Sequence, residues 1–147
     1  MKVIIMQGVP GSGKSTYIGK YTPVDVVVVS ADHYFDKLGR FDPSLLPEAH
    51  GECLRNFTGA LLAKKDSIVV DNTNTTTVEV APYWALAAAY GYEVEILRIV
   101  CDPEVAAARN VHGVPPGAVA AMQKRIDQFE SQMPPWWRIK SYSAPML

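Results

Sequence analysis

The chain has 147 residues, a length that suits one domain built around a single hydrophobic core. Its net charge of −1 argues against a protein whose whole surface binds nucleic acid, and it confines any polyanion site to a local patch. No apolar run approaches the roughly 20 residues that cross a membrane, and the N-terminus predicts no leader. The two cysteines, Cys53 and Cys101, lack the spacing of a metal site, so we expect a cytoplasmic protein without a membrane partner.

Taken in chain order, apolar segments of strand length alternate with segments of helical spacing. The strands are predicted over 2–7, 24–30, 67–71 and 93–100, where β-branched runs without polar alternation are typical of a sheet buried on both faces. The helices are predicted over 14–20, 44–65, 75–90, 103–110 and 117–130, with a short helix and loop over 33–43 and an irregular tail over 131–147. This alternation predicts an α/β fold of three layers with a mainly parallel sheet and a single domain over 1–147.

The first predicted strand leads into a glycine-rich segment with the pattern G-x-x-x-x-G-K-[ST]. Backbone N–H groups of such a loop, together with the N-terminus of the helix that follows, bind phosphate oxygens. We therefore predict an ATP site made by Gly8, Pro10, Gly11, Ser12, Gly13, Lys14, Ser15 and Thr16. Lys14 would bridge the outer phosphates and the Ser15 hydroxyl would bind Mg²⁺. An inert glycine-rich turn is the alternative, and the strand-to-helix context argues against it.

Asp32 lies two residues beyond the second predicted strand, on the side of the sheet where the glycine-rich loop lies. A kinase needs a group that accepts the proton of the attacking hydroxyl, and a carboxylate here would serve. The alternative is a helix N-cap, for which both Ser30 and Asp32 are suitable. His33 is interpreted as an exposed neighbour, and a catalytic acid–base role is the alternative.

Asp71 ends the third predicted strand, an arrangement in which a carboxylate holds Mg²⁺ directly or through water. The polar residues Asn72, Thr73 and Asn74 follow it. They are predicted either to contact substrate or to make a tight turn, and the residues alone leave both readings open.

Arg109 ends a predicted helix, ahead of a loop that carries glycine and two prolines, 112–116. A segment in this position, about 105–120, is predicted to form a small helical lid whose arginine contacts the phosphates. A cation that merely stabilises a helix C-terminus is the alternative. Arg98, inside a strand, is expected to pair with Glu93, Glu95 or a surface carboxylate.

Trp136 and Trp137 lie beside Arg138 and Lys140 in the tail. Adjacent tryptophans predict packing against the body of the protein or against a second copy of the chain, so a homo-oligomer is one expectation. Stacking on nucleic-acid bases is the other.

Four motifs together resemble the phage-type polynucleotide 5′-kinase branch of the P-loop kinases, and they are also similar to the ATP-binding, zeta-toxin-like AAA kinase domains related to it. The motifs are Gly8 to Thr16, Ser30 to Tyr34, Val70 to Asn74, and Arg109-Asn110 before His112-Gly113-Val114-Pro115, and the resemblance spans roughly residues 1–125. It implies a P-loop kinase fold and an ATP-dependent, Mg²⁺-requiring transfer to the 5′-hydroxyl of a polynucleotide.

Position by position, the resemblance implies that Lys14 and Ser15 bind phosphates and Mg²⁺, that Asp32 is the general base, that Asp71 positions the site, and that Arg109 contacts the donor phosphates. The family's arginine for the acceptor phosphate is missing.

Phe35 occupies the position of that arginine, and Arg40 is the proposed substitute. This departure keeps two alternatives open: a small-molecule, nucleoside or modified-base kinase of the same fold, and an ATP-binding switch without transfer activity.

Overall fold

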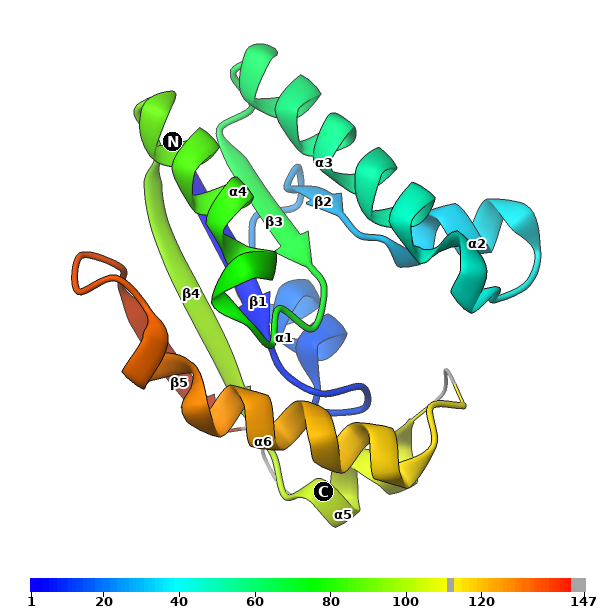
Figure 1. Ribbon diagram of the computed structural model, residues 1–147. Coiled ribbons are helices and arrows are strands. Elements are labelled where there is room, and N and C mark those ends of the chain that lie inside the picture. Colours follow the sequence, from blue (N-terminus) through cyan, green and yellow to red (C-terminus); the bar gives the residue numbers. More distant parts are fainter. Residues whose placement is uncertain (111–112, 144–147) are drawn as a thin grey trace.

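The computed structural model describes residues 1–110 and 113–143, so His112 of the predicted loop lies outside the described residues. Its elements, labelled in Figure 1, follow one another along the chain as β1 (Lys2–Gln7), α1 (Lys14–Tyr21), β2 (Val27–Val29), α2 (Asp32–Leu38), the 3₁₀ turn η1 (Pro43–Leu45), α3 (Leu46–Leu62), β3 (Ser67–Asp71), α4 (Thr77–Ala89), β4 (Glu93–Val100), α5 (Pro103–Arg109), α6 (Pro116–Gln132) and β5 (Ile139–Ser143).

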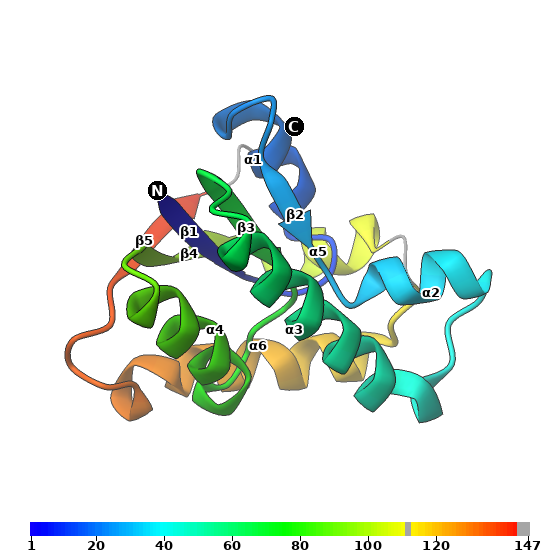
Figure 2. The same ribbon diagram turned by 90° about the horizontal axis from the view of Figure 1, so that it is seen from above.

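The strands form one sheet in the order β2-β3-β1-β4-β5, and every pair of neighbours is parallel. Helix α1 covers one face of the sheet, while α3, α4 and α6 cover the other, which gives three layers (Figure 2). The α/β fold class predicted from the sequence is therefore confirmed. Because the strands are parallel, their carboxyl ends meet at one edge, where ligands of such sheets bind.

The core explains why the strands are apolar on both faces. Along β1, Val3 and Ile5 face the α3 and α4 side, and Met6 faces α1 together with the partly buried Ile4. Side chains of successive strand residues point to opposite faces, so a strand covered by helices on both sides needs an unbroken apolar run. The central position of β1 thus follows from its composition.

Two segments differ from their predicted structure. The strand expected over 24–30 is reduced to Val27–Val29, because Pro23 begins a turn in which its carbonyl accepts the N–H of Val26 at 3.1 Å, leaving Val24 fully exposed. Residues 139–143, expected in an irregular tail, form β5 and pair with β4 from Ile96↔Ile139 to Val100↔Ser143. Helix α6 also reaches Gln132, two residues beyond its predicted end.

The tail is anchored by one of its two tryptophans. The Trp137 ring stacks on Trp84 with 5.3 Å between ring centroids and is 7% exposed, whereas Trp136 is 71% exposed. The predicted packing against the body of the protein therefore applies to Trp137. Self-association through the tail stays a prediction, and Trp136 is the exposed side chain available for it. Across the described ranges, none of the helices combines the length and apolar content that a membrane crossing requires.

Candidate active site

The glycine-rich loop connects β1 to α1 in the conformation that its glycines permit. Gly11 and Gly13 have φ of 81° and 110°, in the left-handed region, and Gly13 is the N-cap residue of α1. The loop is tied to the end of β3, since the Gly8 N–H donates to the Thr73 carbonyl at 3.2 Å. The first N–H groups of α1, which have no partner within a helix, therefore lie at the loop, where they would stabilise an anion.

Ser12 supplies a test of whether the loop fits a phosphate. Its Oγ is buried and has no hydrogen-bond partner in the part of the chain that the structure describes. Buried hydroxyls are normally paired, so this one is suited to donate to an oxygen that the chain does not supply. A Cβ at Gly8 would lie 2.7 Å from that Oγ, so any side chain at residue 8 would force the Ser12 hydroxyl to move. Both observations fit a phosphate group.

Lys14 is the central cation of the site. Its Nζ donates to the carbonyls of Gly8 at 2.9 Å and Val9 at 3.1 Å. Burial lowers the pKa of Lys14, and the negative charges of Asp71 and Asp32 act in the opposite direction. Two carboxylates that are distant in sequence are therefore close enough to Lys14 to influence its charge, which is the clustering at strand ends that the sequence predicts.

Asp32 is the first residue of α2 and is exposed to solvent. The hydroxyl of Ser30 accepts the Asp32 N–H at 3.1 Å, so Ser30 satisfies the start of this helix. The negative charge of Asp32 acts to raise the pKa of Lys14, so the carboxylate is near enough to Lys14 to affect its charge. His33, next to it, is exposed as expected.

The residues after β3 have a structural role as turn residues. Asn74 is 1% exposed with a φ of 49°, and its Nδ2 donates to the Met6 carbonyl at 2.7 Å. Asn72 Oδ1 accepts the Ala31 N–H at 2.9 Å, which connects the end of β3 to the residue before Asp32. The half-buried Thr73 contributes the carbonyl bonded to Gly8. These bonds connect the segments that carry Asp32 and Asp71 to the glycine-rich loop. Direct substrate contact by Asn72, Thr73 and Asn74 stays a prediction.

Arg109 is half-buried at the end of α5, the helix that lies against the loop. A Cβ at Gly11 would lie 2.1 Å from the Ala106 carbonyl oxygen and 3.0 Å from the Asn110 N, so the last turn of α5 contacts the bare backbone of Gly11. This arrangement brings Arg109 to the phosphate side of the sheet, and its contact with phosphates stays a prediction.

Arg40 lies in the loop between α2 and η1. It follows α2, its side chain is 64% exposed, and it forms an ion pair with Asp42 at 3.0 Å. Phe35 is buried between Ala31 and Ala49, so the position of the family arginine has become part of the contact between α2 and α3. Arg40 is thus paired within its own loop, and its contact with substrate stays a prediction.

Arg125 on α6 was not identified from the sequence. Its Nε donates to the Oγ1 of Thr75 at 3.2 Å, in the connection between β3 and α4. No motif marks it, since its position depends on how α6 packs. Arg98 pairs with Glu130 and donates to Gln7 Oε1 at 2.7 Å, so the expected carboxylate partner is one at the surface of α6.

A divalent cation would be held by few protein groups. Among residues 1–110 and 113–143, no three His, Cys, Asp or Glu side chains gather into a metal site. Ser15 is exposed at the start of α1 and Asp71 is half-buried at the end of β3. A hydroxyl and a carboxylate suit Mg²⁺, which usually completes its shell with water and substrate phosphates. Mg²⁺ binding through these two residues stays a prediction.

The loop, the parallel sheet and the helices around it define the P-loop kinase fold, a class of nucleotide-binding domains. Residues 3–135 match the family described as AAA domain, and the chain belongs to that family.

Human NEDD4-binding protein 2 is 34% identical over 139 residues, which cover 88% of this chain but 8% of that protein. The chain thus spans about a twelfth of the length of this relative.

Two solved structures place the fold among kinases. A chain of the Pnkp1/Rnl/Hen1 RNA repair complex superposes with a TM-score of 0.73 over 90% of this chain and 46% of that chain, at 18% identity. The Mycobacterium tuberculosis APS kinase CysC, solved with AMPPNP and APS, superposes with a TM-score of 0.58 over 99% of this chain and 90% of that chain, at 17% identity. At these identities the likeness shows the fold, and the predicted P-loop kinase resemblance is confirmed at that level.

Proposed function

We propose that the chain is an ATP-dependent kinase that transfers the γ-phosphate to a hydroxyl, with the 5′-hydroxyl end of a polynucleotide as its acceptor. The observation that carries this proposal is that the charges of both Asp71 and Asp32 act on the buried Lys14, which also bonds the carbonyls of the glycine-rich loop. A protein that only bound ATP would need the cation but not a second, exposed carboxylate at the acceptor side. A fold shared with a chain of an RNA repair complex supports the choice of acceptor.

In the proposed reaction, the Asp32 carboxylate accepts the proton of the attacking hydroxyl. The hydroxyl oxygen forms a bond to the γ-phosphorus while the bond from that phosphorus to the bridging oxygen breaks, and ADP leaves. Lys14, the loop N–H groups and Arg109 stabilise the negative charge on the transferring group. Mg²⁺, when bound at Ser15 and Asp71, neutralises charge on the phosphates.

The first experiment replaces the proposed base. We expect Asp32→Ala to lower turnover with a 5′-hydroxyl oligonucleotide roughly 10²-fold or more, because proton transfer in the transition state is lost. ATP affinity should be nearly unchanged. Asp36→Ala, which removes an exposed carboxylate from the same helix, is the matched control and should keep its turnover. Undiminished turnover in Asp32→Ala would remove Asp32 from this role.

A small-molecule or nucleoside kinase is the second candidate. The pairing of Arg40 with Asp42, and the burial of Phe35 at the position of the family arginine, favour it. Labelled ATP offered with oligonucleotides, nucleosides and sugars in competition would separate the two candidates. ATP binding without any phosphorylated product would instead favour the switch.

A further inference from the structure

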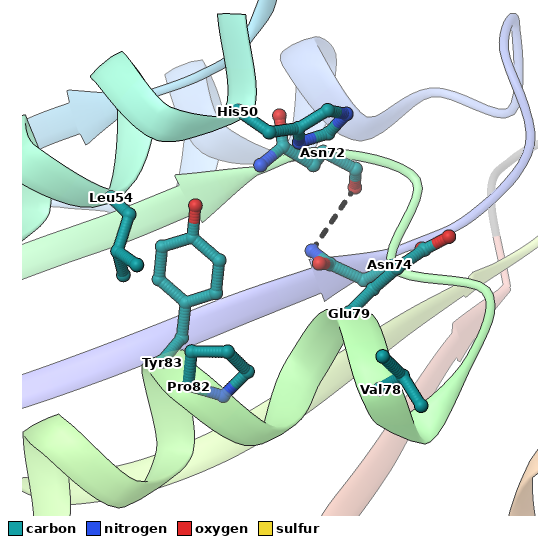
Figure 3. A pocket seen from close by; sticks show the side chains of 8 residues that line it. All are labelled: His50, Leu54, Asn72, Asn74, Val78, Glu79, Pro82 and Tyr83. Atoms are coloured by element: carbon teal, nitrogen blue, oxygen red, sulfur yellow. Dashed lines mark hydrogen bonds between the residues drawn. The ribbon is translucent and has the colours of Figure 1, made fainter. Parts of the chain in front are cut away.

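A pocket of about 300 Å³ lies between α3 and α4, beside the connection that follows β3 (Figure 3). Helix α3 contributes His50 and Leu54, and helix α4 contributes Val78, Pro82 and Tyr83. Asn72, Asn74 and Glu79 add polar groups. Mostly apolar walls with a few placed polar groups are typical of sites for small organic ligands, and this volume suits a single ring system.

Two polar groups of the pocket, Asn72 and Glu79, are held by hydrogen bonds. Asn72 is oriented by the Ala31 N–H on its Oδ1 and by Cys53 Sγ, 3.5 Å from its Nδ2. One carboxylate oxygen of Glu79 accepts the Thr75 N–H at 2.8 Å, and the other can accept an N–H from an occupant. The Tyr83 ring stands upright in the pocket with its hydroxyl towards Asn72, as Figure 3 shows. Preorganised groups of this kind favour a planar, hydrogen-bonding ring.

The pocket adjoins the candidate active site through Asn72. This residue directly follows Asp71, and its side chain bonds the residue that precedes Asp32. A ligand in the pocket would therefore lie next to the two chain segments that contain Asp32 and Asp71. That is the acceptor side of the site, since the donor phosphates belong to the loop after β1.

Arg125 brings a cation to the same region. Its partner Thr75 directly follows Asn74 in the chain, and the Thr75 N–H donates to Glu79. Asn74 and Glu79 both line the pocket, so Arg125 is bonded to a residue that lies between them in this network. Only the Nε of Arg125 is used in the bond to Thr75, and the two terminal nitrogens of its planar group suit a phosphate. Arg40, the cation expected for this task, is paired elsewhere.

We propose that the pocket between α3 and α4, together with Arg125, binds the acceptor as a nucleoside that carries a phosphate, with the base in the pocket and the phosphate at Arg125. The inference rests on the proposed function and narrows its acceptor class. It assigns base recognition to residues outside the four motifs, and it assigns phosphate recognition to α6 rather than α2.

The test measures binding apart from catalysis. A trinucleotide with a free 5′-hydroxyl and a fluorophore at its 3′ end is titrated with protein by fluorescence anisotropy, without ATP. Val78→Trp, which places a large ring at the pocket, and Arg125→Gln should each weaken binding about tenfold. Their controls, Ala88→Trp on α4 and Lys124→Gln on α6, change exposed residues outside the pocket and should stay within about twofold of the original chain.

Salt dependence checks the role given to Arg125. Arg125→Gln should reduce the slope of log K against log salt by about 0.7, because one phosphate contact to a single strand is lost, while Arg125→Lys and Lys124→Gln should keep the slope. Far-ultraviolet circular dichroism confirms that each variant is folded. Equal binding by Val78→Trp and the original chain, or the same slope in Arg125→Gln and Lys124→Gln, would overturn the inference.

Transfer of labelled phosphate from ATP separates this inference from the proposed function. Binding that responds to Val78→Trp and Arg125→Gln, without any phosphorylated oligonucleotide, would support the site and refute the kinase activity. Phosphorylation with an unchanged KM for the oligonucleotide in both variants would overturn the site and leave the kinase activity standing.

Discussion

Gly11 shows how one missing side chain positions a loop and a helix together. Its φ of 81° is strained for any residue with a Cβ, and that Cβ would lie 2.1 Å from the Ala106 carbonyl oxygen. The contact can exist only between bare backbone atoms. The glycine required for phosphate binding by the sequence motif therefore also determines where α5, and with it Arg109, can lie.

We predict that Gly11→Ala lowers the free energy of unfolding by roughly 1–3 kcal/mol, from backbone strain and from the displaced helix. It should also weaken ATP binding, because the loop must distort. Urea unfolding and nucleotide titration measure the two effects. Gly19→Ala is the control, since a Cβ there meets no atom within 4 Å.

Gly19 lies inside α1, and replacing a glycine inside a helix by alanine should stabilise the protein by roughly 0.5–1 kcal/mol. If Gly11→Ala were as stable as Gly19→Ala, the close contact between the loop and α5 would be wrong.

Lys14 makes nucleotide affinity depend on pH. Burial lowers the Lys14 pKa in the free protein, whereas bound phosphates would raise it, so the complex binds a proton more tightly than the free protein does. Affinity for ATP should therefore fall as pH rises through the lowered pKa of Lys14, at a pH below its ordinary value of 10.5.

Titrations with a fluorescent ATP analogue at a series of pH values below 10.5 would measure this loss. Lys14→Arg should lose the pH dependence, because an arginine stays protonated throughout. A slope that persists in Lys14→Arg would assign the effect to another group.

At the scale of elements, the chain just before β5 is anchored by Trp137. Trp137 packs between Trp84 of α4 and Phe129 of α6, with ring centroids 5.3 Å and 6.2 Å apart. This contact joins two helices and brings the chain back to the edge of the sheet. In the strand that follows, Ile139 and Tyr142 are partly buried and the other three side chains are exposed, so β5 buries less apolar surface than the central strands do.

Trp137→Ala should accordingly cost roughly 3–5 kcal/mol of unfolding free energy through the cavity that it leaves. Trp136→Ala, in the neighbouring exposed position, should stay within about 0.5 kcal/mol of the original chain. Urea unfolding monitored by circular dichroism gives both values. Equal losses in the two variants would mean that the tail is not held by Trp137.

At the scale of the whole molecule, the parts that follow from local patterns could be predicted from the sequence. An unbroken apolar run such as the one in β1 identifies a strand covered on both faces, and the glycine-rich loop identifies the edge where ligands bind. The meeting of Asp32 and Asp71 at Lys14 then follows from parallel topology, because strand ends converge.

Other parts of the molecule depend on packing that no local pattern encodes. The sequence of β5, Ile-Lys-Ser-Tyr-Ser, alternates weakly and forms a strand because β4 offers a free edge. Arg125 reaches Thr75 only because of the position of α6, and the pocket exists only because α3 and α4 are spaced by their other contacts. Contact of Arg40 with substrate stays a prediction, and its partner in the described residues is Asp42 of the same loop.

The direction of β5 bears on how this domain can be joined to other sequences. Ser143 lies opposite Val100 at the carboxyl edge of the sheet, whereas Lys2 lies opposite Ser67 and Glu93 at the other edge. A segment fused after Ser143 would therefore start on the side of the phosphate loop and could reach whatever binds there. A segment fused before Lys2 would start at the far side, which makes that terminus the better place for an affinity tag.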